Sequence, residues 1–143
     1  MQTFKYYARL ILALPVGIVA WFAAVALSHI SISSALGDSL LTEIAIAFMP
    51  DLVGAGIGVM ATQWMAPRYK TGLALAATGL LFLVTGGMMT LAWYSGALAW
   101  PMVFGALGSL IGASIAAYGA VKESRRLAEW TAYRQSLEEQ TSQ

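Results

Sequence analysis

An acidic residue inside an apolar run is the strongest chemical signal in this sequence. Asp51 follows Met49 and Pro50 in the middle of a largely apolar stretch from Ser39 to Pro67. A charged side chain at the centre of a membrane-spanning helix costs about 2.5 to 3.5 kcal/mol on insertion scales. Acids in such positions take up protons, bind cations or join neighbouring helices through hydrogen bonds. Asp51 is therefore the first candidate site residue.

Two chemical interpretations of Asp51 are open. In the first, Asp51 binds and releases a proton or a cation, helped by Glu43, which lies about 12 Å nearer the outer end of the same helix. In the second, Asp51 is protonated or forms a hydrogen bond with a Ser, Thr or Trp group on a neighbouring helix, and so joins the two helices. The candidate hydroxyl groups belong to Thr85, Thr90 and Ser109.

The other polar residues predict neither catalysis nor a bound cofactor. The chain has no cysteine and one histidine, His29, which excludes thiolate metal sites and leaves no histidine pair for zinc or haem. His29, Asp38 and Glu43 are too loosely spaced to predict a metal site. The glycine-rich segment 54–58 lacks the preceding strand and the following Lys-Ser/Thr of a phosphate-binding loop. We therefore expect a protein that is not an enzyme and that holds no cofactor and no metal.

Small residues follow Asp51 and recur in the last apolar run. Gly54 and Gly58 have the spacing at which small residues let membrane helices approach closely. At about 100° per residue, both fall within roughly 60° of Asp51, so we predict that the carboxyl shares their face and points into the bundle. The last run carries a second stripe, at Gly108, Gly112, Ala116 and Ala120. We predict that both stripes are helix-packing surfaces.

The composition predicts that lipid surrounds most of the chain. Of the 143 residues, 59% are hydrophobic and 10% are charged, against about one quarter charged in ordinary soluble domains. The mean hydropathy is +0.70. A net charge of +1 excludes the clustered basic surface of a nucleic-acid-binding protein. We therefore expect an integral membrane protein whose partners include the lipid bilayer and no nucleic acid.

The apolar residues form four runs, each about as long as a membrane-spanning helix requires. We predict an all-α bundle of two helical hairpins. The predicted spans are 10–29, 40–66, 71–94 and 97–121, preceded by an interfacial segment at 1–9 and followed by an amphipathic helical tail at 122–143. Basic residues before the first run would also suit a secretory signal, but this run is longer than a signal core.

Charged and aromatic residues predict how the bundle lies in the membrane. All eight Lys and Arg residues lie in the N-terminal segment, in the connection between the second and third runs, or in the tail. Because Lys and Arg concentrate in cytoplasmic loops, both termini are predicted to be cytoplasmic, in a cell membrane and specifically a bacterial inner membrane. The aromatic residues predicted to anchor the interfaces are Tyr6, Tyr7, Trp64, Trp93, Trp100 and Trp130.

Two functions from different classes fit this sequence. The first is a non-catalytic accessory, assembly or interaction subunit, whose glycine-rich faces pack against a second copy or within a larger membrane complex. The alternative is a small oligomeric proton- or cation-coupled transporter or channel, with Asp51 as the titrating group. A water-filled path to Asp51 would favour transport, whereas a dry hydrogen bond to a neighbouring helix would favour assembly.

Overall fold

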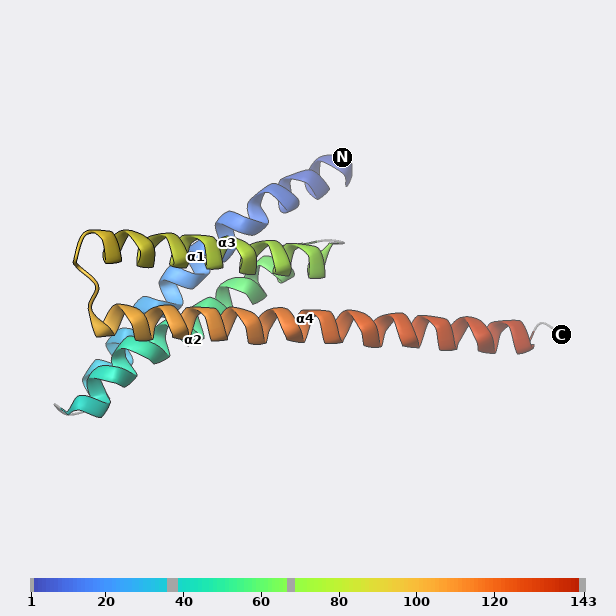
Figure 1. Cartoon of the computed structure of the whole chain (residues 1–143). Helices are drawn as coiled ribbons and strands as arrows, with labels where there is room; N and C mark the ends of the chain where they lie inside the picture. Colours follow the sequence, from blue (N-terminus) through green and yellow to red (C-terminus); the bar gives the residue numbers. More distant parts are fainter. Residues whose placement is uncertain (1, 36–38, 67–68, 142–143) are drawn as a thin grey trace.

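The computed structural model describes residues 2–35, 39–66 and 69–141, and these residues form four α-helices (Figure 1). The helices are α1 (Gln2–Ala35), α2 (Leu40–Met65), α3 (Lys70–Tyr94) and α4 (Trp100–Thr141). All four are long and apolar enough to cross a membrane. The prediction of an all-helical protein with four helices of spanning length is therefore confirmed.

Several helix ends differ from the predicted ones. Helix α1 begins at Gln2, within the predicted interfacial segment, and continues through Ala35, past the predicted end of the first span at residue 29. The Ser31 hydroxyl donates to the Leu27 carbonyl at 2.8 Å, so this turn-forming residue type is accommodated inside the helix. Helix α4 begins at Trp100, later than predicted, because Gly96 adopts a φ of 70° and residues 97–99 stay outside the helix.

Helix α2 is the central element of the bundle. It packs extensively along α1 and along α4, whereas α3 rests mainly on α4 and makes fewer contacts with α2. Helix α1 barely contacts α3. Two antiparallel hairpins result, α1 with α2 and α3 with α4, and the first crosses the second obliquely in Figure 1.

The start of α1 and the end of α4 lie at the same end of the bundle as the end of α2 and the start of α3 (Figure 1). The end of α1, the start of α2 and the connection between α3 and α4 lie at the opposite end. The helix ends that carry Lys and Arg therefore gather at the end with the termini. Helix α4 continues past this end as a straight helix to Thr141, so the predicted tail is helical and projects from the bundle.

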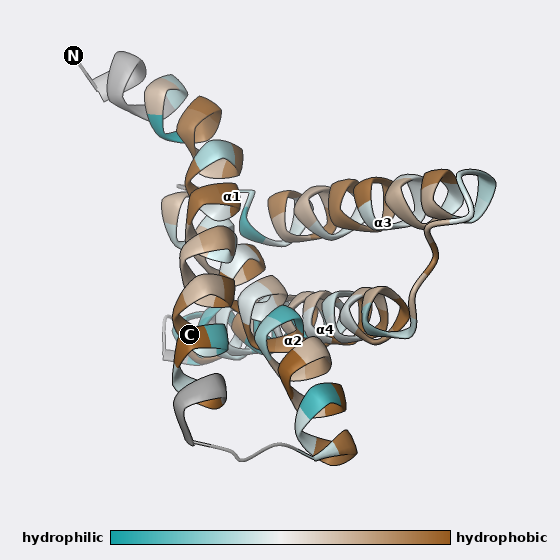
Figure 2. Cartoon of the chain, turned by 90° about the vertical axis from the view of Figure 1, so that its left-hand side faces the viewer, coloured by the Kyte–Doolittle hydropathy of each residue, from teal (hydrophilic) through white to brown (hydrophobic). Residues whose placement is uncertain are grey.

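The interior of the bundle is built from small residues. Ala13, Ala55, Ala74 and Ala113 are fully buried, and Val59 is the largest hydrophobic side chain that is almost completely covered. Large apolar side chains are instead exposed on the outside, among them Phe22, Trp64 and Leu83. Figure 2 shows by its brown colour that hydrophobic residues recur along the helices. This distribution suits a helical bundle in lipid, where close packing of the helices replaces a core of large side chains.

We expect Gly112→Ala to destabilise the bundle. A Cβ atom at residue 112 would overlap the Leu52 carbonyl oxygen and lie 2.8 Å from its carbonyl carbon, and these backbone atoms cannot rotate away. Overpacking of this kind typically costs about 1 to 3 kcal/mol. The measurement is thermal unfolding of the purified protein in a mild detergent.

Gly119→Ala is the matched control, because a Cβ atom at residue 119 of the same helix meets nothing within 4 Å. Alanine favours helix more than glycine does, so this variant should unfold at the wild-type temperature or slightly above it. Equal losses in the two variants would contradict the close approach of α4 to α2.

Candidate functional site

Asp51 lies in the contact between α2 and α4. Its side chain is half-buried, and the Ser109 hydroxyl of α4 donates a hydrogen bond to its carboxylate. Ser109 itself is only 3% exposed. Gly105, one turn earlier on α4, leaves room for the carboxylate, since a Cβ atom there would lie 2.5 Å from Asp51 Oδ2. Ser109 and Gly105 thus form one small polar contact between two helices.

The glycines after Asp51 face a different helix from its carboxylate. A Cβ atom at Gly58 would lie 2.9 Å from the Gly17 carbonyl oxygen, and one at Gly54 would meet Trp21, so both glycines contact α1. The prediction that Asp51 shares their face is therefore wrong for its side chain. At about 100° per residue, Asp51 lies between these glycines and the α4-facing Phe48, so its carboxyl reaches α4 from the edge of both faces.

The second glycine stripe packs against the backbone of α2. Gly108 lies against the carbonyl of Phe48, and Gly112 lies against Leu52. Further along α4, Ala116 is partly buried against the core and Ala120 is 7% exposed. All six residues predicted to pack helices, Gly54, Gly58, Gly108, Gly112, Ala116 and Ala120, therefore lie in contacts within this chain.

His29 is the neighbour of Asp51 that the sequence interpretation missed. Its imidazole is exposed on α1 and lies close enough to interact electrostatically with the Asp51 carboxylate. The register of the first hairpin explains this proximity. Gly17 lies opposite Gly58 and Trp21 opposite Gly54, so continuing the pairing brings His29 opposite the turn before Asp51. The proximity of His29 to Asp51 could be predicted only once the register between α1 and α2 was known.

Glu43 does not join this site. It lies in the first turn of α2 with an exposed side chain, after the Ser39 hydroxyl has capped the helix by accepting from the Thr42 N–H at 3.2 Å. Asp38, considered with His29 and Glu43 as a possible metal cluster, lies outside the described residues. Among the described residues, no three His, Cys, Asp or Glu side chains are grouped so that they could hold a metal ion.

The predicted interface anchors are exposed wherever their side chains are described. Trp64 and Trp93 are the next-to-last residues of α2 and α3, and Trp100 is the first residue of α4. All three exposed rings therefore lie at the ends of the bundle. Tyr7 and Trp130 are also exposed, and the side chain of Tyr6 lies outside the described part of the chain. Anchoring at a lipid interface stays a prediction for these residues.

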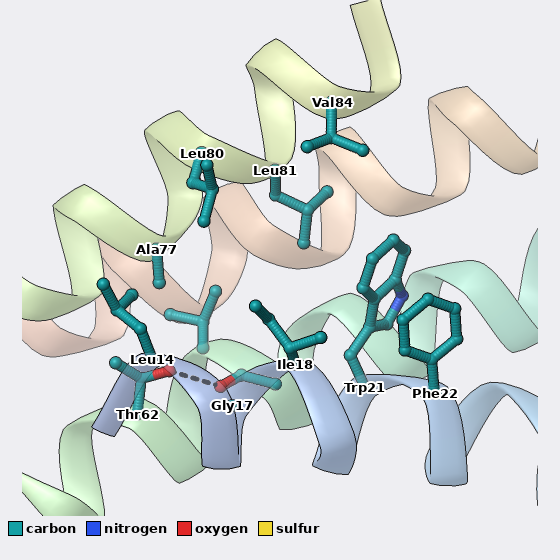
Figure 3. Close-up of a pocket in the computed structure, with 12 residues that line it drawn as sticks. Leu14, Gly17, Ile18, Trp21, Phe22, Thr62, Ala77, Leu80, Leu81 and Val84 are labelled. Atoms are coloured by element: carbon teal, nitrogen blue, oxygen red, sulfur yellow. Dashed lines mark hydrogen bonds between the residues drawn. The ribbon is translucent and has the colours of Figure 1, made fainter. Parts of the chain in front are cut away.

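An apolar pocket of about 190 Å³ lies between α1, α2 and α3 (Figure 3). Trp21, Phe22 and Leu81 are among its lining residues, and Asp51 is not. The Thr62 hydroxyl in its wall donates to the Gly58 carbonyl at 2.9 Å. Trp21 Nε1 is buried and has no hydrogen-bond partner within the described residues. This pocket therefore offers no polar path toward the acid.

Comparison of the chain with protein-family models, with curated proteins and with solved structures finds no match. The site is consequently defined by its own geometry. That geometry is an acid on α2 held by a buried hydroxyl on α4, beside glycines that bring the two backbones together.

We expect Ser109→Ala to weaken the packing of α4 on α2, because the Asp51 carboxylate loses its donor. Hydrogen bonds between membrane helices contribute about 0.6 kcal/mol on average and up to about 1.7 kcal/mol. Asp51→Asn should cost less, since the amide oxygen still accepts from Ser109. Unfolding of the three proteins in a mild detergent measures these differences.

Ser114→Ala serves as the control in that series. The Ser114 hydroxyl is exposed on the same helix and donates to the Leu110 carbonyl at 2.7 Å, so it joins no second helix. A loss of stability in Ser114→Ala as large as that in Ser109→Ala would refute an interhelical role for Ser109.

Proposed function

We propose that this chain is a non-catalytic membrane protein that acts as an accessory, assembly or interaction subunit. The hydrogen bond from Ser109 to Asp51 is the observation that carries the proposal. It gives the acid inside the bundle a structural partner, at the contact where Gly108 and Gly112 meet the α2 backbone. An acid used in this way joins helices and needs no substrate.

The surroundings of Asp51 offer less support for the transport alternative. Transport through an acid requires a hydrated or polar path that reaches it. Asp51 lines neither the apolar pocket of Figure 3 nor the grooves between α3 and α4 and along the tail. Glu43, the proposed second carboxylate, has an exposed side chain in the first turn of α2, eight residues before Asp51.

In this proposal, a partner subunit or a second copy contacts α3. The glycine faces recognised in the sequence are occupied within the bundle, so they are not the surface offered to a partner. Helix α3 is the least covered helix, with 11% of its most apolar segment buried. Gly72, Gly79 and Gly86 recur along it, and a Cβ atom at any of them would meet nothing within 4 Å.

We further propose that the termini are cytoplasmic, in the inner membrane of a bacterial cell. The Lys and Arg residues support this orientation, because they gather at the end of the bundle with the termini and such residues concentrate on the cytoplasmic side. The proposal assigns the short connection at Ser95 to the outside.

Cysteine labelling tests this orientation, since the natural chain has no cysteine and gives no background. In intact cells, a membrane-impermeant maleimide should label Ser95→Cys and should label Ser136→Cys only after permeabilisation. Both serines are exposed, so access to the reagent decides the result. Labelling of Ser136→Cys in intact cells, with Ser95→Cys protected, would reverse the topology.

Crosslinking in native membranes tests the proposed function. A bifunctional maleimide should join Gly79→Cys to a neighbouring subunit and give a discrete larger band on a denaturing gel. Val84→Cys is the control, because it lies about 140° around α3 from residue 79 and lines the pocket of Figure 3. Its adduct should be at least several-fold weaker.

Each of the two candidate functions has an experimental outcome that would reject it. No adduct from either variant, together with a monomer in several mild detergents, would end the accessory proposal. Proteoliposomes supply the second measurement, in which wild type, Asp51→Asn and empty vesicles should show equal proton flux. A pH-dependent flux that wild type supports and Asp51→Asn abolishes would establish the transport alternative in its place.

A further inference from the structure

A groove between α3 and α4 lies at the end of the bundle that carries the termini. Its volume is about 300 Å³. Leu75 of α3 forms one wall, and residues of α4 form the remainder. The lining residues are Leu75, Ala117, Tyr118, Val121, Lys122 and Arg125. The groove is therefore apolar over most of its length and has two cations at its tail end.

The two cations are free to bind an external anion. Lys122 and Arg125 are three residues apart, which places them on one face of α4. Within the described part of the chain, neither forms an ion pair or a side-chain hydrogen bond. Of the nearby acids, Glu123 lines a groove beside Lys70, and Glu129, four residues after Arg125, lines one beside Arg126. The groove thus carries two positive charges that no carboxylate lining it neutralises.

The groove also lies at the depth of a lipid headgroup. Lys122 begins the polar tail directly after the last apolar run, and long cationic side chains at such positions extend toward the headgroups. Tyr118, one turn earlier, is exposed and belongs to the residue types enriched at membrane interfaces. The apolar part of the groove suits an acyl chain, and the tyrosine and the two cations at its end suit the phosphate of the headgroup.

We propose that this groove binds one anionic phospholipid. The acyl chain lies along Leu75, Ala117 and Val121, and the phosphate lies at Lys122 and Arg125. Basic pockets between membrane helices bind anionic lipid headgroups in this manner. The groove is formed by α3 and α4 of a single chain, so lipid binding requires no partner. Leu75 lies about 40° around α3 from Gly79, so a partner on the glycine face of α3 would lie next to the bound lipid.

Two other pockets of the molecule lack the combination of an apolar lining with cations that no carboxylate in the lining neutralises. The pocket of Figure 3 has no cation in its lining. The groove on the opposite side of α4 has both Lys70 and Glu123 in its lining, so an anionic headgroup there would meet a carboxylate. The charge and the apolar length needed for an anionic phospholipid therefore coincide between α3 and α4.

Spin-labelled lipids provide the test, with the full chain in nanodiscs of phosphatidylcholine. Electron paramagnetic resonance measures the fraction of labelled lipid that the protein immobilises, for labelled phosphatidylglycerol and for labelled phosphatidylcholine. The wild type should prefer phosphatidylglycerol. Lys122→Gln and Arg125→Gln should each lower this preference about fivefold at low salt, the effect of one cation near a membrane surface.

Arg126→Gln is the matched control. It removes the same charge one residue further on, but Arg126 points about 100° away around α4 and lines a different groove. Its preference for phosphatidylglycerol should stay near that of wild type. A loss as large as that in Arg125→Gln would show a general attraction between a basic helix and an anionic surface, and would overturn the site.

Two further measurements examine the lipid itself. Leu75→Ala should lower immobilisation of both lipids with the cations intact, and because Leu75 is half exposed the fold should persist, as circular dichroism will verify. Excess inorganic phosphate should not displace phosphatidylglycerol. Unchanged immobilisation in Leu75→Ala, or displacement by phosphate alone, would overturn the lipid as the ligand.

Discussion

The close approach of three helix backbones is the constraint on which the rest of the structure depends. In lipid, helices gain little from burying apolar side chains against one another, so they associate through packing at short range and through interhelical hydrogen bonds. Glycines at 17, 54 and 58 bring α1 onto α2, and glycines at 105, 108 and 112 bring α4 onto α2. Each contact places one helix against backbone atoms of the next. The bundle therefore has an interior of alanine and an exterior of large apolar side chains.

Asp51 is tolerated because of the same constraint. The absence of a side chain at Gly105 leaves space for its carboxylate, and the short distance between α2 and α4 brings the Ser109 hydroxyl within hydrogen-bonding reach. The polar group and the glycines thus form one contact rather than two separate features. The chain consequently divides into an inner part, which holds its own helices together, and an outer part formed by α3 and the tail.

Run length and hydropathy were enough to predict four helices, because each run is continuous and bounded by polar residues. The C-terminal end of α1 was not predictable, since the Ser31 hydroxyl donates to a carbonyl of its own helix and a residue type common in turns is thereby accommodated in the helix. Spacing identified the glycines as packing positions but not their partner helices. Helical angles give directions around one axis, and the neighbour in each direction is set by tertiary packing. For that reason Ser109 could be named only as one of three candidates, and the proximity of His29 was missed.

Helix α4 connects the inner and outer parts of the molecule mechanically. Its 42 residues run without a break from the bundle into the tail, a length of about 63 Å at 1.5 Å per residue. No proline or glycine interrupts it after Gly119. Because the helix is continuous, we expect a turn or tilt of the tail to reach the segment that holds Ser109, and with it the contact to Asp51. The tail and the contact between α2 and α4 are thus parts of one continuous helix.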